Sequence, residues 1–100
     1  MSDVKGVTSM SDMMRIVREK IDGIDSGKYQ ITSFPGSTTV TYTVGFALDR
    51  FAEIGSERSA QDAFDWLDRE QIEIVQTIRA ERGLRSLQYR QQHHRNGFGY

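Results

Sequence analysis

Apolar side chains recur at spacings of three and four residues near the start of the chain, which is the pattern of one helix face. The positions are Met10, Met13, Met14, Val17, Ile21 and Ile24. Ser9, with Asp12 three residues later, resembles a capping box and marks the start of this helix. Gly23 marks its predicted end, and residues 1–8, which show no period, are expected to form a flexible N-terminus.

A period of two then follows, which is typical of a strand with one buried face. Val40, Tyr42, Val44, Phe46 and Leu48 alternate with Thr39, Thr41, Thr43, Gly45 and Ala47, so residues 39–48 are predicted to form a strand. Residues 28–34 are predicted to form another strand, joined to the first by a type II turn at Pro35-Gly36. Residues 49–55 favour a third strand, and the alternative is a helical turn that pairs Phe51 with Ile54.

A second helical pattern begins after Ser59, which has Asp62 three residues later. One arc of the predicted helix holds Ala60, Ala63, Phe64, Leu67, Ile74, Val75 and Ile78, with Gln71 as a polar exception and Trp66 at the margin. Gly83, followed by Leu84, fits a Schellman ending, after which the chain is expected to change direction. Residues 84–100 are therefore predicted to form a shorter helix or an extended arm.

These elements predict one α+β domain over residues 9–83, since about 100 residues are enough for one ordinary domain. A small antiparallel sheet of two or three strands would be packed by an N-terminal helix and a longer C-terminal helix. The C-terminal arm would extend from this domain. Open sheet edges invite pairing with another chain, so a homo-oligomer is one expected assembly.

The composition narrows the classes of protein. Hydrophobic residues make up 37% of the chain and charged residues 27%, which is typical of a soluble globular domain. The apolar runs are too short for a transmembrane helix or a secretory signal, so no membrane partner is expected. The expected location is the cytoplasm, either of a host cell or in a virion if the chain is viral. The absence of cysteine excludes disulfides and thiol chemistry.

Few residues point to catalysis. His93 and His94 are the only histidines, and no Asp or Glu lies within ten residues of them to complete a metal site. No Gly-x-Ser-x-Gly motif is present, and the glycines do not form a phosphate-binding loop. We therefore expect no cofactor, no metal and no enzymatic activity. A small enzyme would require a cleft with converging titratable groups.

Charge is distributed unevenly along the chain. Residues 1–78 hold 8 Lys or Arg against 13 Asp or Glu, whereas residues 79–100 hold five arginines and one glutamate. The basic end either meets an acidic partner or folds back on the acidic body. One alternative function is therefore nucleic-acid binding, with phosphates held by arginines and a base stacked on a tyrosine. The arginines of this alternative are Arg79, Arg82, Arg85, Arg90 and Arg95.

The helix before this basic end is acidic. Eight carboxylates lie between Asp49 and Glu73, and Asp65, Arg69 and Glu73 are spaced to form ion pairs on a solvated helix face. A sharper interpretation is a surface that competes with nucleic acid for a basic groove. Residues 63–70, Ala-Phe-Asp-Trp-Leu-Asp-Arg-Glu, resemble the acidic helix of a phage anti-CRISPR that mimics DNA. Small phage-encoded inhibitors are therefore among the candidate classes.

The function predicted from the sequence is a non-enzymatic protein–protein interaction module. Examples are a small phage-type inhibitor of a host complex and a connector component of a viral assembly. Aromatic and arginine side chains are typical anchors of protein interfaces, and the arm is rich in both. The predicted partner-binding residues are Arg85, Tyr89, Arg90, Arg95, Phe98 and Tyr100 in the arm, with Asp62, Asp65 and Glu73 on the acidic helix.

Overall fold

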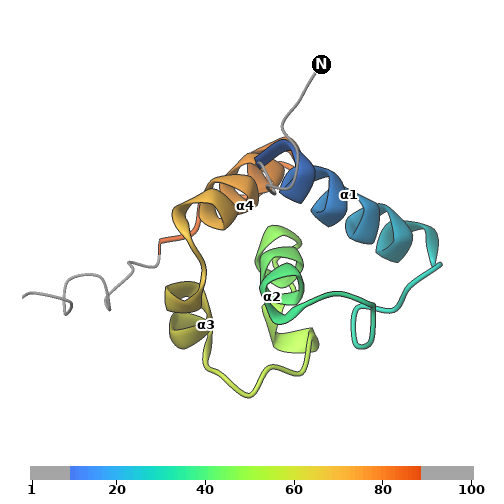
Figure 1. Cartoon of the computed structure of the whole chain (residues 1–100), viewed down its shortest axis with the longest axis horizontal. Helices are drawn as coiled ribbons and strands as arrows, with labels where there is room; N and C mark the ends of the chain where they lie inside the picture. The colour runs from blue at the N-terminus through green and yellow to red at the C-terminus, as the bar shows by residue number, and fades with distance from the viewer. Residues whose placement is uncertain (1–9, 89–100) are drawn as a thin grey trace, which may run out of the picture.

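The computed structural model describes residues 10–88, and these residues form helices and loops without any strand (Figure 1). The helices are α1 (Met10–Ser26), α2 (Thr38–Ala47), η1 (Phe51–Glu53), α3 (Ala60–Trp66) and α4 (Arg69–Glu81), where η1 is a single 3-10 turn. The predicted α+β class is therefore wrong, and the described part of the chain is all-α. The predicted flexible N-terminus, residues 1–8, lies outside the described residues.

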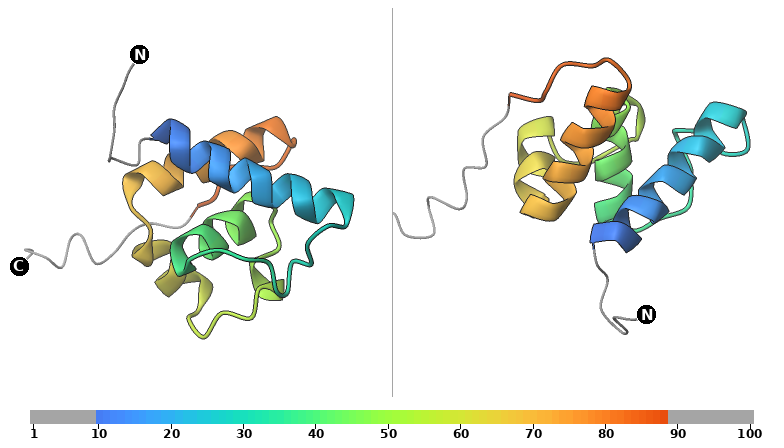
Figure 2. Two further views of the ribbon diagram at one scale, coloured as in Figure 1. Left: turned by 45° about the vertical axis from the view of Figure 1, so that its right-hand side comes forward. Right: turned by 90° about the horizontal axis from the view of Figure 1, so that it is seen from above.

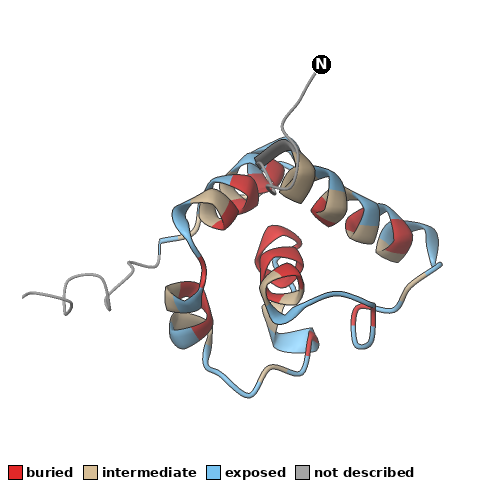
Figure 3. Cartoon of the chain, viewed as in Figure 1, coloured by how far each residue is buried: buried red, intermediate tan, exposed pale blue. Residues whose placement is uncertain are grey.

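Helix α2 occupies the centre of the fold. It contacts α1, α3 and α4, and Figure 2 shows α1 and α4 lying alongside it. Buried residues of the surrounding helices face inward toward it (Figure 3). Two residues that were predicted to face away from the core, Thr43 and Ala47, are also buried, at 0% exposed. Residues 42–47 of α2 are all buried, and a helical segment that is covered around its whole circumference shows no 3.6-residue apolar period, which explains the wrong strand prediction for residues 39–48.

The start of α2 has a clear chemical cause. Ser37 is its N-cap, and the Ser37 hydroxyl accepts a hydrogen bond from the Val40 amide at 3.2 Å. The Thr43 hydroxyl, which is fully buried, donates to the Thr39 carbonyl at 2.7 Å, so no polar group is left without a partner there. Pro35-Gly36 therefore precedes a capped helix rather than joining two strands.

Helix α1 confirms the predicted N-terminal helix, but it continues past Gly23 to Ser26. The Tyr29 ring lies directly against Gly23, where an added Cβ would be 2.2 Å from a ring carbon. Gly23 therefore permits a close approach and does not end the helix. Residues 28–34 form a loop that returns along α1 and buries Ile31 and Phe34, so the strand predicted there is also wrong.

Residues 49–55 form a helical turn, which was the alternative to a third strand. Phe51 in η1 stacks on Phe46 with ring centroids 4.6 Å apart, and Ile54 is buried. Gly45 on α2 faces this turn, since an added Cβ would be 3.3 Å from the Phe51 Cα and 3.2 Å from the Ile54 side chain. The glycine that was part of a predicted strand thus lets η1 pack against α2.

The long C-terminal helix predicted from the sequence is divided into α3 and α4. Leu67 and Asp68 separate them, with Leu67 only 1% exposed. Asp68 and Gln71 form a capping box, in which the Gln71 side chain accepts from the Asp68 amide at 2.8 Å. Gln71, the polar exception in the predicted arc, therefore caps the start of α4.

The predicted end of this region at Gly83 is confirmed. Gly83 has a φ of 76°, the Leu84 amide donates to the Arg79 carbonyl at 2.8 Å, and the Gly83 amide donates to the Ala80 carbonyl at 3.1 Å. These are the two hydrogen bonds of a Schellman motif. Residues 84–88 then run without helical structure, as one of the two predictions for the arm required.

Candidate protein-interaction site

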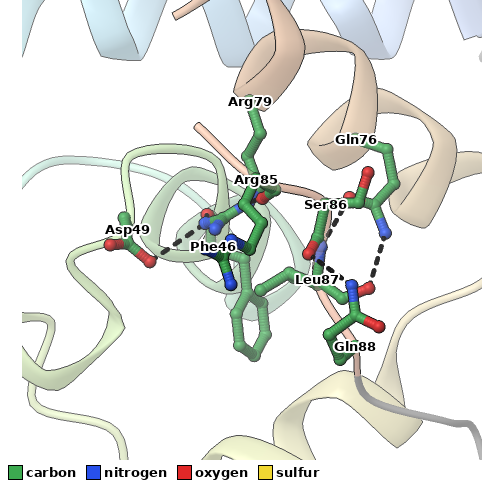
Figure 4. Close-up of polar contacts among 8 residues, drawn as sticks. All are labelled: Phe46, Asp49, Gln76, Arg79, Arg85, Ser86, Leu87 and Gln88. Atoms are coloured by element: carbon green, nitrogen blue, oxygen red, sulfur yellow. Dashed lines mark hydrogen bonds and ion pairs between the residues drawn. The ribbon is translucent and has the colours of Figure 1, made fainter. Parts of the chain in front are cut away.

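Arg79, one of the arginines predicted to contact nucleic acid, is used inside the protein (Figure 4). It is 5% exposed, and its Nη1 donates to the Phe46 carbonyl at 2.7 Å and to Asp49 Oδ1 at 3.1 Å. Its Nε donates to the Arg85 carbonyl at 2.8 Å. Because Phe46 lies at the C-terminus of α2, the guanidinium also faces the negative end of the helix dipole. Arg79 therefore does not contribute to an exposed basic surface.

Arg82 also has an internal partner. Its guanidinium pairs with Asp25 of α1 at 3.1 Å, next to a second link between α1 and α4 in which Arg18 contacts Glu81 through two hydrogen bonds. The Arg85 side chain is exposed, and only its carbonyl is bonded by Arg79. Part of the basic end thus folds back on the acidic body, as one of the two sequence interpretations expected.

The other predicted arm residues, Tyr89, Arg90, Arg95, Phe98 and Tyr100, lie outside the described residues. His93 and His94 also lie outside them. The roles predicted for these arm residues remain predictions.

The predicted acidic residues are divided between two helices. Asp62 and Asp65 lie on α3, and Glu73 lies on α4. Asp62 and Glu73 are exposed, whereas Asp65 is half-buried and its Oδ1 accepts from Gln61 Nε2 at 3.2 Å. Asp65, Arg69 and Glu73 were predicted to form ion pairs along one helix face. They do not lie on one helix, because residues 67 and 68 separate α3 from α4.

Sequence reasoning missed the most distinctive surface feature, the indole of Trp66. At 47% exposure, it is the exposed large hydrophobic side chain of the described residues. The Arg58 guanidinium stacks on it, with Cζ 4.0 Å from the ring centroid, and the indole N–H donates to the Thr39 hydroxyl at 3.4 Å. The sequence placed Trp66 at the margin of the predicted apolar arc. This marginal position was the one indication that the indole would be partly exposed.

Tyr42 and Ser56 hold Arg58 in this position. Arg58 Nη1 donates to the Tyr42 hydroxyl at 2.9 Å, and the Ser56 hydroxyl lies 3.3 Å from the same oxygen. The Tyr42 ring meets the Trp66 ring edge-on, with centroids 6.5 Å apart. We call Tyr42, Ser56, Arg58 and Trp66 the Trp66 cluster. It joins α2, the loop after η1 and the end of α3.

Two opposing effects set the acidity of Tyr42. Burial raises the pKa of its phenol, but the hydrogen bonds from Ser56 and Arg58 outweigh burial and bring the pKa below its usual value. The nearby positive charge of Arg58 acts in the same direction. The network therefore favours a tyrosine oxygen that accepts hydrogen bonds, which keeps the guanidinium in place over the indole.

Replacing Arg58 by methionine should raise the pKa of Tyr42, because burial would then act with less opposition. The measurement is phenolate absorbance during alkaline titration, with Tyr42→Phe used to assign the signal. Arg50→Met is the matched control, since Arg50 pairs with Glu53 rather than with the Trp66 cluster. An unchanged Tyr42 titration in Arg58→Met would contradict the network.

A small cavity adjoins the Trp66 cluster. Its volume is about 300 Å³, and Thr38, Thr41, Ser56 and Arg58 line it. This volume is near the lower end of the usual range for ligand pockets, and it suits one side chain of a partner. An exposed indole, a stacked guanidinium and a polar cavity thus adjoin one another.

Three further observations bear on the class of protein. Within the described part of the chain, no three metal-ligating carboxylates or histidines come together. No helix among residues 10–88 is long and apolar enough to cross a membrane. Comparisons with family models, with curated proteins and with solved structures find no match for the chain.

Proposed function

We propose that this chain is a non-enzymatic protein-interaction module that binds a partner protein through the Trp66 cluster. The observation that carries this proposal is an exposed tryptophan fixed in one orientation by a stacked arginine. Tryptophan, tyrosine and arginine are the side chains most often found at the energetic centre of protein interfaces. The cluster contains all of these residue types within one contact network.

Preorganisation supports the same proposal. A long side chain such as arginine loses conformational entropy when a partner orders it, and this loss weakens binding. In the Trp66 cluster, Arg58 is already held by Tyr42 and by the indole. Exposed Asp62 and Glu57 lie near the cluster in the sequence and provide candidate polar residues for its rim.

The alternative of nucleic-acid binding has less support among the described residues. Arg79 and Arg82 are engaged with Asp49 and Asp25. The outward positions of α4 include Glu73, Thr77 and Glu81, which do not form a basic surface for phosphates. The narrower roles, a phage-type inhibitor or a viral connector acting in the cytoplasm or in a virion, remain proposals from the sequence.

A pull-down with the full chain as bait tests the proposed function. Trp66→Ala should recover at least about tenfold less of the partner than the unsubstituted chain, because truncating a central aromatic anchor removes much of the binding energy. Thr77→Ala, at an exposed position on α4, is the matched control and should recover the partner fully. Circular dichroism melts should show that both variants are folded.

The same experiment separates the two functions. Treating the lysate with nuclease should leave recovery of a protein partner unchanged, and moderate salt should have little effect. Equal recovery by Trp66→Ala and the unsubstituted chain would overturn the assignment to the Trp66 cluster. Recovery of nucleic acid that is lost in moderate salt would instead support the alternative.

A further inference from the structure

A second surface, separate from the Trp66 cluster, already holds a peptide segment: the chain's own residues 84–88 (Figure 4). The Leu87 amide donates to Gln76 Oε1 at 2.9 Å, and Gln76 Nε2 donates to the Leu87 carbonyl at 3.4 Å. Arg79 Nε donates to the Arg85 carbonyl at 2.8 Å. Side chains of α4 thus bind main-chain atoms of an extended segment, as a peptide-binding groove does.

The groove also has a place for an apolar anchor. The Leu87 side chain packs against the core while remaining half-buried. Beside it lies a cavity of about 270 Å³, lined by Phe46, Phe51, Ala60 and Leu87 itself. The anchor therefore leaves part of the available space unfilled. We call Gln76, Arg79, Phe46, Phe51 and Ala60 the arm groove.

The arm is held weakly compared with the helices. Leu84 donates the closing Schellman bond to the Arg79 carbonyl, but residues 85–88 are not helical, and Gly83 precedes them with a φ of 76° that glycine readily adopts. Segments with few buried contacts open at a lower free energy than the global unfolding of the protein. The arm can therefore leave its groove while the helices stay folded.

We propose that two copies of this chain exchange their arms, so that residues 84–88 of each copy bind the arm groove of the other. The arm groove already matches this segment in its main-chain hydrogen bonds and its leucine, so a second copy of the chain carries the segment that fits it. Exchange between identical chains preserves each of these contacts and needs only a change of direction near Gly83. This assembly goes beyond the proposed function, because it uses a different surface.

A labelled peptide of residues 84–100 tests whether the groove accepts the segment from a separate molecule. It is titrated into the full chain carrying Leu87→Ala, whose own arm has lost its anchor, and binding is followed by fluorescence anisotropy. The Leu87→Ala chain should bind the peptide about tenfold more tightly than the unsubstituted chain, because its groove is occupied for less of the time. Absence of peptide binding to the Leu87→Ala chain would overturn the proposal.

Two further variants make the result specific to the arm groove. Adding Gln76→Ala to the Leu87→Ala chain should abolish peptide binding, since the bonds to the Leu87 main chain are lost. Adding Gln88→Ala is the matched control and should leave binding unchanged, because Gln88 Nε2 donates to the Ser86 carbonyl of its own arm. Equal binding by both double variants would contradict the assignment, provided that melting curves show both to be folded.

The assembly itself is measured by light scattering of the full chain over a range of concentrations. A dimer should form as concentration rises, and both Leu87→Ala and Gln76→Ala should reduce it. Peptide binding by the Leu87→Ala chain together with a strictly monomeric unsubstituted chain would overturn the exchange, since the groove would then act only within one molecule. A dimer that is insensitive to both variants would also overturn it.

Discussion

Replacing Arg79 by methionine should lower the free energy of unfolding by about 3 kcal/mol. Methionine keeps much of the apolar stem but cannot donate to the Phe46 and Arg85 carbonyls, which are the acceptors of Nη1 and Nε. At the buried Phe46 carbonyl, which also accepts from the Asp49 amide, water does not replace the lost hydrogen bond, so the loss costs more than it would at an exposed carbonyl. Urea denaturation followed by circular dichroism measures the change.

Arg82→Met is the matched control for this prediction. Arg82 lies in the same basic region, but its pair with Asp25 is partly exposed to solvent, at 37% for the arginine side chain. An exposed pair of this kind contributes at most about 1 kcal/mol. Equal losses for Arg79→Met and Arg82→Met would show that the buried hydrogen bonds of Arg79 do not contribute specially to stability.

Replacing Gly45 by valine should lower the free energy of unfolding by about 2 kcal/mol. The added side chain would press on the Phe51 backbone and on Ile54, which are already within 3.3 Å of where its Cβ would lie. The same change would favour a strand, because valine has a high β propensity and glycine a low one. Thermal melts therefore distinguish the two conformations. A lower melting temperature for Gly45→Val is expected from the observed helix, and a higher one from the strand that the alternating pattern predicted.

Thr38→Val serves as the control for Gly45→Val. It introduces the same residue into the same helix at an exposed position, and valine has nearly the shape of threonine. The expected change is within about 0.5 kcal/mol, as for most surface substitutions. A stabilised Gly45→Val would contradict the packing of η1 against α2.

Several features of the fold were predictable from the sequence because their causes are local. The face of α1 follows from apolar spacing along one chain segment, and the end of α4 follows from Gly83 in a left-handed conformation. The start of α3 at Ser59 is likewise a local cap, in which the hydroxyl accepts from the Asp62 amide. Such signals do not depend on what the rest of the chain does.

The central helix could not be predicted in this way, because tertiary burial determined its conformation. The alternating threonines of α2 resemble the polar face of a strand, yet the Thr43 hydroxyl donates to the Thr39 carbonyl one turn earlier, and the Thr41 hydroxyl donates to the Ser37 carbonyl. Ser37 as an N-cap was the local signal available against the strand. The division between α3 and α4 also had a signal, the pair formed by Asp68 and Gln71.

The candidate site was less predictable than the fold. Trp66 and Arg58 are eight positions apart, and Tyr42 lies on another helix, so only folding brings them together. Arg79, which was predicted to contact nucleic acid, belongs to the interior, and its partners Phe46 and Asp49 are distant in sequence. Spacing within one segment carries no information about such contacts.

The central position of α2 has a consequence for the fate of the unfolded chain. Its segment Thr38–Ala47 contains no charge and no proline, and it consists mainly of β-branched and aromatic residues. This composition is typical of segments that assemble into cross-β fibrils when they are exposed. The surrounding helices therefore sequester the most aggregation-prone part of the chain. Variants that loosen those helices should precipitate as β-rich aggregates, and the lifetime of the protein in solution should follow its resistance to unfolding.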